Sequence, residues 1–143
     1  VELYAFCTPE QSGDLHAEIL ERAETAMRDL GLAHRVLDLC AGDISGAGAR
    51  TFDVEVFAPG ADRWLEVSSV SWCTDYQARR ANIRYRPTDE KGTRVVHSLN
   101  GTGLAVPRVW AAIVETDRQP DGTVRLPEVL HPHLGGLTSI GAR

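Results

Sequence analysis

Residues 64–80 read WLEVSSVSWCTDYQARR and change from one kind of secondary structure to another. The run from Trp64 to Val70 is rich in the residue types that favour strands and follows a break at Pro59 and Gly60. Asp75 then stands where a helix N-cap belongs, and residues 76–81 continue as a helix. The stretch therefore predicts a strand that leads into a short helix.

The sequence on either side of this stretch predicts more strands than helices. Helices are expected after Ser12, where apolar residues recur at helical spacing up to a C-cap at Gly31, and over about Leu104–Val114. Strands are expected over 1–6, 35–39, 52–57 and 94–99, whereas residues 127–143 are expected to be irregular. Because the strands do not alternate regularly with helices, the chain is predicted to be an α+β domain with an antiparallel β-sheet and flanking helices.

The composition is that of one ordinary globular domain. The chain has 143 residues, of which 43% are hydrophobic and 24% are charged, and its net charge is −5. These values argue against disorder, and no apolar run is long enough for a membrane span. The three cysteines include no C-x-x-C pair, which argues against a zinc site or a disulfide framework. We therefore expect reduced thiols in a cytoplasmic protein.

The usual nucleotide-binding signatures are missing from this sequence. It has no P-loop, and Gly46-Ala47-Gly48 lacks the third glycine of a dinucleotide-binding turn. Strand alternation places Glu66 and Ser69 on opposite faces, so a joint role for these two residues would require a bulge or a strand end.

A second segment, residues 97–108, reads HSLNGTGLAVPR. Its glycines would let the backbone approach a ligand closely, and Arg108 could hold an anion from the first turn of the following helix. A glycine turn with a surface arginine explains the same residues equally well. The residue pattern leaves both interpretations open.

Taken together, several stretches resemble the class II aminoacyl-tRNA synthetases, and within them the seryl-tRNA synthetases, from Val1 to about Gly136. The resemblance is carried by Arg35-Val36-Leu37, Ala41-Gly42-Asp43, Phe52-Asp53-Val54-Glu55-Val56, Glu66-Val67-Ser68-Ser69, residues 77–86 (QARRANIRYR), Leu99-Asn100-Gly101, Asp121-Gly122 and Pro127-Glu128-Val129-Leu130. It implies that residues 1–143 are the C-terminal part of a class II catalytic core. The tRNA-binding arm and the first and second class-defining motifs of the family are absent from this sequence.

The resemblance also implies an activity. The complete enzyme would be a serine-tRNA ligase that uses ATP and Mg²⁺ to convert serine to seryl-adenylate and then transfers the seryl group to tRNA(Ser). It would act as a homodimer in the cytoplasm, without a membrane or DNA partner, and the isolated chain is expected to be incomplete. The alternative is a truncated synthetase paralogue that binds a nucleotide, an amino acid or a protein partner without aminoacylating tRNA.

Four residues are assigned to the ATP side of the site by the resemblance. Arg108 matches the arginine of the third class-defining motif, which grips the γ-phosphate of ATP. Glu66, Val67 and Ser69 match the ATP-binding segment, in which Glu66 and Ser69 would also hold Mg²⁺. Mg²⁺ prefers hard oxygen ligands and keeps phosphates in its shell, which suits this pair. Glu66 and Arg108 are the expected catalytic residues.

Three further residues are assigned to the serine side. Glu2 matches the glutamate that binds the serine ammonium group. Asn100 and Thr102 match the polar residues at the base of the site that recognise the amino acid and its hydroxyl. Trp72 departs from the family, which usually has asparagine there. Because this position is expected near the serine and the adenylate, the indole is predicted to narrow or occupy the pocket, which favours the paralogue alternative.

Overall fold

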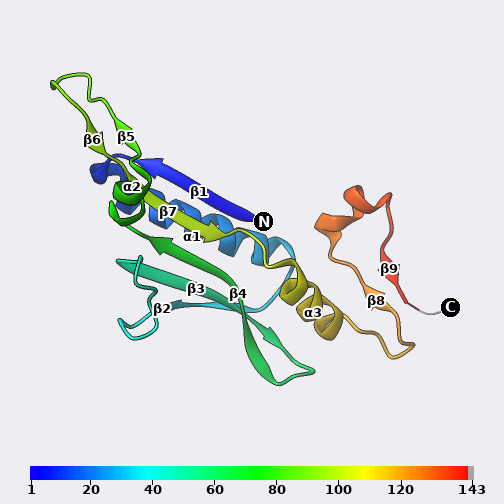
Figure 1. Cartoon of the computed structure of the whole chain (residues 1–143). Coiled ribbons are helices and arrows are strands. Elements are labelled where there is room, and N and C mark those ends of the chain that lie inside the picture. Colours follow the sequence, from blue (N-terminus) through cyan, green and yellow to red (C-terminus); the bar gives the residue numbers. More distant parts are fainter. Residues whose placement is uncertain (142–143) are drawn as a thin grey trace.

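The computed structural model describes residues 1–141, and its centre is a five-stranded antiparallel sheet in the order β1-β7-β4-β3-β2 (Figure 1). The strands are β1 (Glu2–Cys7), β2 (His34–Asp38), β3 (Arg50–Ala58), β4 (Arg63–Trp72) and β7 (His97–Thr102). The strand expected over 94–99 is divided, because β6 (Arg94–Val95) leaves the sheet to pair with β5 (Arg84–Tyr85). The predicted α+β class with an antiparallel sheet is confirmed.

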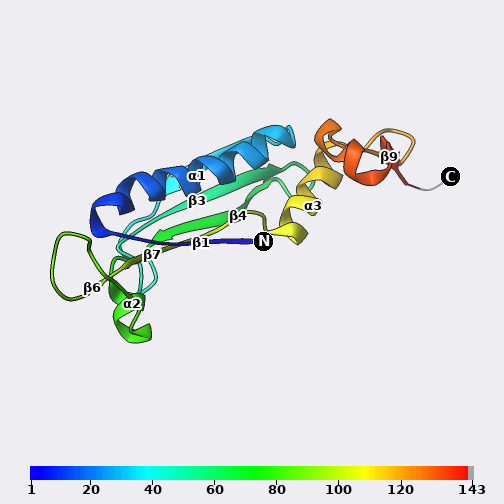
Figure 2. The same cartoon turned by 90° about the horizontal axis from the view of Figure 1, so that it is seen from above.

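Helix α1 (Ser12–Asp29) lies along one face of the sheet (Figure 2). Its buried side chains include Ile19, Ala23 and Met27, which recur at helical spacing and pack against the sheet. The helix ends as predicted, with Gly31 at a φ of 70° just beyond the last turn. Ser12 is the first helical residue rather than the cap, and a 3-10 turn, η1 (Pro9–Gln11), precedes it.

Two shorter helices lie at the ends of the central strands. Helix α3 (Val106–Thr116) packs against β3 and β4 and adds Val109, Ala112 and Ile113 to the same core as α1. Helix α2 (Tyr76–Ala81) begins as predicted after Asp75, whose carboxylate pairs with Arg79 at 3.0 Å instead of capping the helix. In Figure 2, α2 lies on the side of the sheet away from α1. Most of that second face is left without a helix.

The C-terminal segment is more regular than expected. Strand β8 (Val124–Arg125) pairs with β9 (Ser139–Ile140), and the 3-10 helix η2 (Glu128–Leu134) lies between them. The prediction of irregular chain over 127–143 is therefore wrong for η2 and β9, and residues 142 and 143 lie outside the described residues. The short strands escaped prediction because each holds only two residues, too few to show an alternation.

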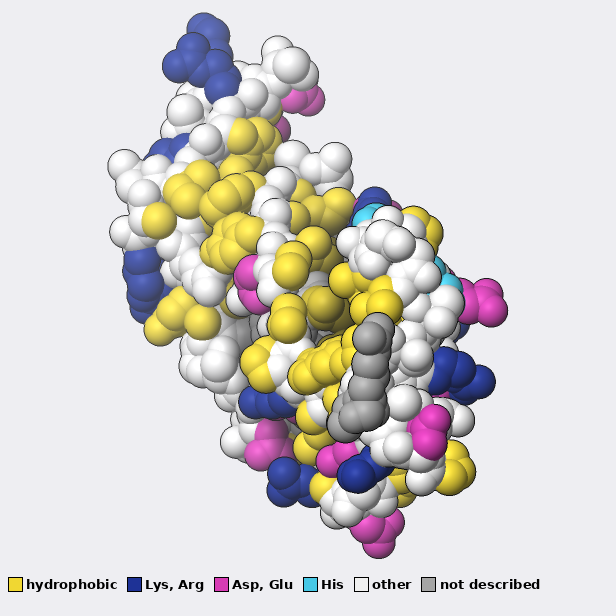
Figure 3. Space-filling view, turned by 90° about the vertical axis from the view of Figure 1, so that its right-hand side faces the viewer, with side chains coloured by type: hydrophobic (Ala, Val, Ile, Leu, Met, Phe, Trp, Pro, Cys, Tyr) yellow, Lys and Arg dark blue, Asp and Glu magenta, His cyan; other side chains and the backbone are white. Residues whose placement is uncertain are grey.

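Large hydrophobic side chains remain exposed at one side of the molecule. Figure 3 shows them gathered on the side that carries the N-terminus, α3 and the C-terminal segment. The exposed large residues of that part are Val1, Val106, Trp110, Val129, Leu134 and Leu137. Within residues 1–141, no helix is both long and apolar enough to cross a lipid bilayer.

Gly101 on β7 lies directly beneath α1. A Cβ atom at this position would lie 2.7 Å from Cγ2 of Ile19 and 3.1 Å from Cγ2 of Val70. The space that the absent side chain leaves is therefore filled by the helix and by the neighbouring strand. The sequence left both a ligand role and a structural role open for the glycines of this segment, and at Gly101 the structure gives helix packing as the reason.

Candidate functional site

A β-bulge in β4 changes which side chains share a face. Ser68 pairs with Val54 and Glu66 pairs with Glu55, so Val67 has no partner of its own on β3. An extra residue in one strand reverses the side-chain alternation beyond it. Val54 and Ser68 are buried in the core, so the Glu55–Glu66 pair lies on the opposite face, away from α1.

Ser69 lies on this same open face. It pairs with Asp53 on β3, one position before the buried Ser68–Val54 pair, so its side chain points away from the core. The bulge thus places Glu66 and Ser69 on one face, as their expected joint role required. Simple alternation had separated them.

The expected serine-binding residues also lie on the open face. Glu2 on β1 is directly opposite Thr102 on β7, and Asn100 is opposite both Tyr4 and Ser71. Directly opposed residues of an antiparallel pair share a face, with Cβ atoms about 4.5–5.5 Å apart. Asn100, Gly101 and Thr102 are strand residues, so the chain does not turn at Gly101 and bends only at Gly103.

Arg108 reaches β4 from the first turn of α3. Its Nη1 donates a hydrogen bond of 2.6 Å to the main-chain oxygen of Glu66 and lies 3.5 Å from Oε1 of the same residue. The main-chain N–H of Ala105 donates to the oxygen of Val67 at 3.2 Å, which fixes the start of α3 against the bulge. Both charged side chains remain about half exposed, so the site is open to an anion.

The open face carries two further carboxylates, Glu55 and Asp53, for which the sequence predicted no role. Glu55 is paired with Arg35 at 2.7 Å, and Glu66 lies beside Arg108. Asp53 lies between them and Thr51, and its Oδ1 atom is buried without a hydrogen-bond partner. The alternation of Asp53 and Glu55 along β3 was the available signal, since residues two apart on a strand share a face.

The oxygen donors of this face fit a hard cation. The described residues contain no group of three or more His, Cys, Asp or Glu side chains that could enclose a metal. Mg²⁺ at nucleotide sites is commonly held by one or two carboxylates together with water and phosphate oxygens. Glu66 and Ser69 offer such a partial set, and the unpartnered Oδ1 of Asp53 lies in the next strand.

Comparison with known proteins identifies the family of this chain. Residues 1–117 match the sequence model of the tRNA synthetase class II core domain (G, H, P, S and T). The chain belongs to this family. The predicted resemblance to its seryl members is also confirmed by the relatives.

The curated relatives include serine--tRNA ligases of two bacteria. The protein of Paramagnetospirillum magneticum is 48% identical over 141 residues, which are 99% of this chain and 33% of the relative. That of Synechococcus elongatus is 50% identical over 134 residues, covering 94% of this chain and 31% of the relative. The chain thus spans about a third of the length of the curated relatives it matches.

Two solved structures of the family share the fold closely. Seryl-tRNA synthetase from Pyrococcus horikoshii, complexed with ATP, has a TM-score of 0.95 and 39% identity over 100% of this chain and 32% of its own. The cytoplasmic serine-tRNA ligase from Naegleria fowleri, in complex with AMP, has a TM-score of 0.92 and 34% identity over 99% of this chain and 34% of its own. The partial class II core expected from the sequence is therefore confirmed.

Trp72, the departure from the usual family pattern, lies on the α1 side of the sheet. It pairs with the fully buried Leu99, and its ring packs near His16 and His97 with centroid distances of 6.4 and 6.0 Å. Its Nε1 donates to Nδ1 of His97 at 3.3 Å. The sheet therefore separates Trp72 from the open face, and the indole does not line the candidate site.

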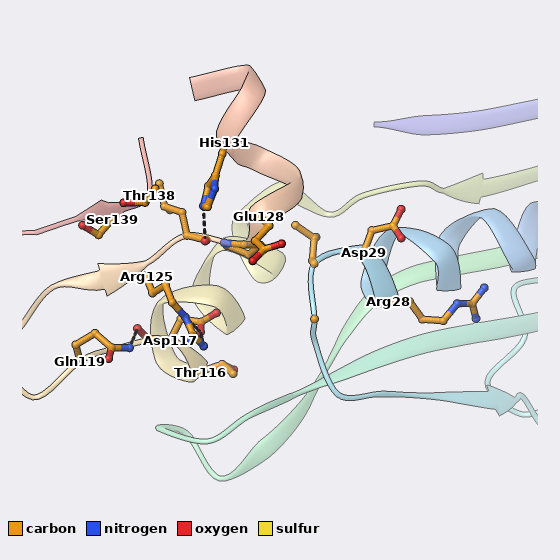
Figure 4. Close-up of a pocket in the computed structure, with 14 residues that line it drawn as sticks. Arg28, Asp29, Thr116, Asp117, Gln119, Arg125, Glu128, His131, Thr138 and Ser139 are labelled. Carbon is orange, nitrogen blue, oxygen red and sulfur yellow. Dashed lines mark hydrogen bonds and ion pairs between the residues drawn. The ribbon is translucent and has the colours of Figure 1, made fainter. Parts of the chain in front are cut away.

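A sizeable cavity lies elsewhere in the described residues. It has a volume of about 790 Å³ and lies between the end of α1, the end of α3 and the C-terminal segment (Figure 4). None of the residues predicted for the site lines it. Its charged side chains are largely satisfied internally, since Arg125 pairs with Asp117 at 2.8 Å and His131 hydrogen-bonds to the Leu126 oxygen at 2.9 Å. The open face of the sheet is therefore the better candidate.

Proposed function

We propose that this chain supplies part of the ATP and serine sites of a seryl-tRNA synthetase. The complete enzyme would activate serine with ATP to seryl-adenylate and transfer the seryl group to tRNA(Ser). The observation that carries the proposal is the position of Arg108, whose guanidinium meets Glu66 on the same face that holds Asn100 and Thr102. The ATP complex of the Pyrococcus horikoshii relative supports the nucleotide part.

On the ATP side, Arg108 would bind the γ-phosphate, and Glu66 and Ser69 would hold Mg²⁺. Val67 would contribute through its main chain, because its side chain is buried in the core. When bound, Mg²⁺ neutralises phosphate charge. The guanidinium of Arg108 can add charge-assisted hydrogen bonds, which are about twice as strong as neutral ones.

On the serine side, Glu2 would receive the ammonium group, and Asn100 and Thr102 would bind the polar part of the amino acid. Glu2 and Thr102 come from adjacent strands and face each other, so they can contact one small ligand together. A site that hydrogen-bonds a substrate hydroxyl rejects analogues without it, because its own polar groups are then left unpaired.

The activation step needs no nucleophile from the protein. The serine carboxylate attacks the α-phosphorus and pyrophosphate leaves, so the protein acts by orienting the two substrates and by stabilising negative charge. Arg108 and Glu66 serve these purposes from fixed positions on α3 and β4. A cytoplasmic location and a homodimeric state of the complete enzyme belong to the same proposal and rest on the family resemblance.

The position of Trp72 does not support the alternative of a truncated paralogue that does not aminoacylate tRNA. Trp72 was the residue expected to close the pocket, and its indole packs beneath α1 instead.

The proposal is tested by calorimetric titration with a non-hydrolysable seryl-adenylate analogue and its alanyl counterpart. The seryl compound is expected to bind roughly tenfold or more tightly, since one buried hydrogen bond distinguishes the two. Thr102→Val, which keeps the shape but removes the hydroxyl, is expected to reduce the preference. Equal affinity of the wild-type chain for both compounds would contradict the serine assignment.

A further inference from the structure

Asp53 is a carboxylate of the open face that has a buried oxygen, Oδ1, without a hydrogen-bond partner among residues 1–141. A buried acceptor without a donor costs about 1–3 kcal/mol, so such atoms are uncommon unless a ligand or another group satisfies them. The atom is therefore a candidate contact for a ligand or for a side chain that moves.

Its two neighbours on the same face do not share this property. Glu55 is held by Arg35 at 2.7 Å, and Glu66 is held by Arg108 at 3.5 Å. In the described part of the chain, none of the ion pairs includes Asp53. A donor for its Oδ1 would therefore be a water molecule, a bound group or a side chain that turns toward it.

Ser69 is the side chain best placed to turn toward Asp53. The two residues are directly opposed on β3 and β4, and their side chains share the open face. Opposed residues have Cβ atoms about 4.5–5.5 Å apart, which brings a hydroxyl and a carboxylate within hydrogen-bonding range after rotation of a side chain. A serine hydroxyl has one proton to donate and two lone pairs.

We propose that Asp53 is a positioning residue whose carboxylate accepts a hydrogen bond from the Ser69 hydroxyl. This inference rests on the proposed function, in which Ser69 is a ligand of the nucleotide-bound Mg²⁺. A hydroxyl that gives a lone pair to a cation must point its proton elsewhere, and the buried Oδ1 of Asp53 is an acceptor on the neighbouring strand. Groups that orient a metal ligand in this way tune affinity for the metal.

The test is a double-mutant cycle of Asp53→Ala and Ser69→Ala, read as the Mg²⁺ concentration needed for tight ATP binding in calorimetry. Asp53→Ala alone is expected to raise that concentration roughly tenfold to a hundredfold. Combined with Ser69→Ala it should add nothing further, because Asp53 acts through the serine hydroxyl. Asp53→Asn retains a side-chain oxygen acceptor and should remain close to wild type.

Asp38→Asn is the matched control. It also removes one carboxylate charge, but Asp38 is paired with Arg50 at 2.7 Å and lies opposite Phe52, away from Asp53. It should leave the Mg²⁺ requirement unchanged, and melting temperatures of all variants will show that each is folded.

The outcomes separate the inference from the function on which it rests. Additive effects of the two alanine substitutions, or a loss in Asp53→Asn as large as in Asp53→Ala, would overturn the positioning role and would indicate that Asp53 binds the metal directly. A wild-type chain that binds ATP without any dependence on Mg²⁺ would overturn the proposed metal site itself.

Discussion

Arg108 and Glu66 are 42 residues apart in the sequence, yet Nη1 of Arg108 lies 2.6 Å from the main-chain oxygen of Glu66. The guanidinium is therefore anchored to the backbone of β4 and is not a freely moving surface charge. A guanidinium has five N–H donors in a planar fork, so this bond leaves others for a ligand. The same contact ties the start of α3 to the strand that carries the bulge.

Replacing Arg108 by alanine should distinguish ATP from AMP. We expect a loss of roughly tenfold to a hundredfold in ATP affinity and a much smaller loss for AMP, since only ATP offers the γ-phosphate. Calorimetric titration with both nucleotides measures the difference. Arg125→Ala, which removes an arginine paired with Asp117, is the control and should change neither affinity. Equal losses for ATP and AMP would mean that Arg108 acts only through its contact with Glu66.

Replacing Glu66 by alanine should change the response to metal more than it changes nucleotide binding itself. In wild type, Mg²⁺ is expected to strengthen ATP binding, and in Glu66→Ala this strengthening should be lost, because a hard-oxygen ligand has been removed. The measurement is ATP affinity with and without excess chelator. Glu55→Gln, on the same face but engaged with Arg35, provides the comparison. A full Mg²⁺ response in Glu66→Ala would contradict its assignment as a ligand.

Trp72→Phe should affect stability and leave the ligand site unchanged. The substitution removes the 3.3 Å hydrogen bond to His97 and leaves a gap beneath α1, which should cost about 1–3 kcal/mol of unfolding free energy. Nucleotide affinity should not change, because the sheet lies between the indole and the open face. Urea unfolding and ATP titration check the two parts. Trp110→Phe, on an exposed face of α3, should change stability little. A change in ATP affinity without loss of stability in Trp72→Phe would restore the expectation that this residue lines the pocket.

Two glycine substitutions should change stability in opposite directions. Gly101→Ala places a Cβ atom 2.7 Å from Ile19 and should destabilise the fold by about 1–3 kcal/mol through overpacking. Gly13→Ala, in the first turn of α1, meets no atom within 4 Å and should stabilise by about 0.4–1 kcal/mol through the unfolded chain. Chemical denaturation of both variants compares them. If Gly101→Ala proved neutral, α1 would have to lie farther from the sheet.

The three thiols should react at different rates. Burial raises the pKa of the Cys7 and Cys73 thiols, so less of each is present as the reactive thiolate at a given pH, whereas Cys40 is exposed. A disulfide reagent at pH 8 should therefore label Cys40 first and the other two only as the chain unfolds. Cys40→Ser should remove the fast phase. All three thiols should react rapidly in denaturant, and rapid labelling of Cys73 in the folded chain would contradict its burial.

The sequence was sufficient for features that depend on neighbouring residues. The spacing of Ile19, Ala23 and Met27 and the glycine at position 31 predicted α1 and its end, and Asp75 marked the start of α2. The motifs around Glu66 and Arg108 predicted the family, because they are carried as contiguous residues. These features are local, so no knowledge of the partner strands was needed.

The arrangement of the site required the tertiary structure. Strand alternation separated Glu66 from Ser69, and only the pairing of β4 with β3 reveals the bulge that brings them to one face. The same pairing places Trp72 beneath α1 and Asp53 opposite Ser69. The residues of one strand do not specify its register with another strand, which depends on the packing of both against a common core. The sequence by itself therefore determined the family, the elements and the candidate residues, and the pairing of distant strands decided which of those residues share a face.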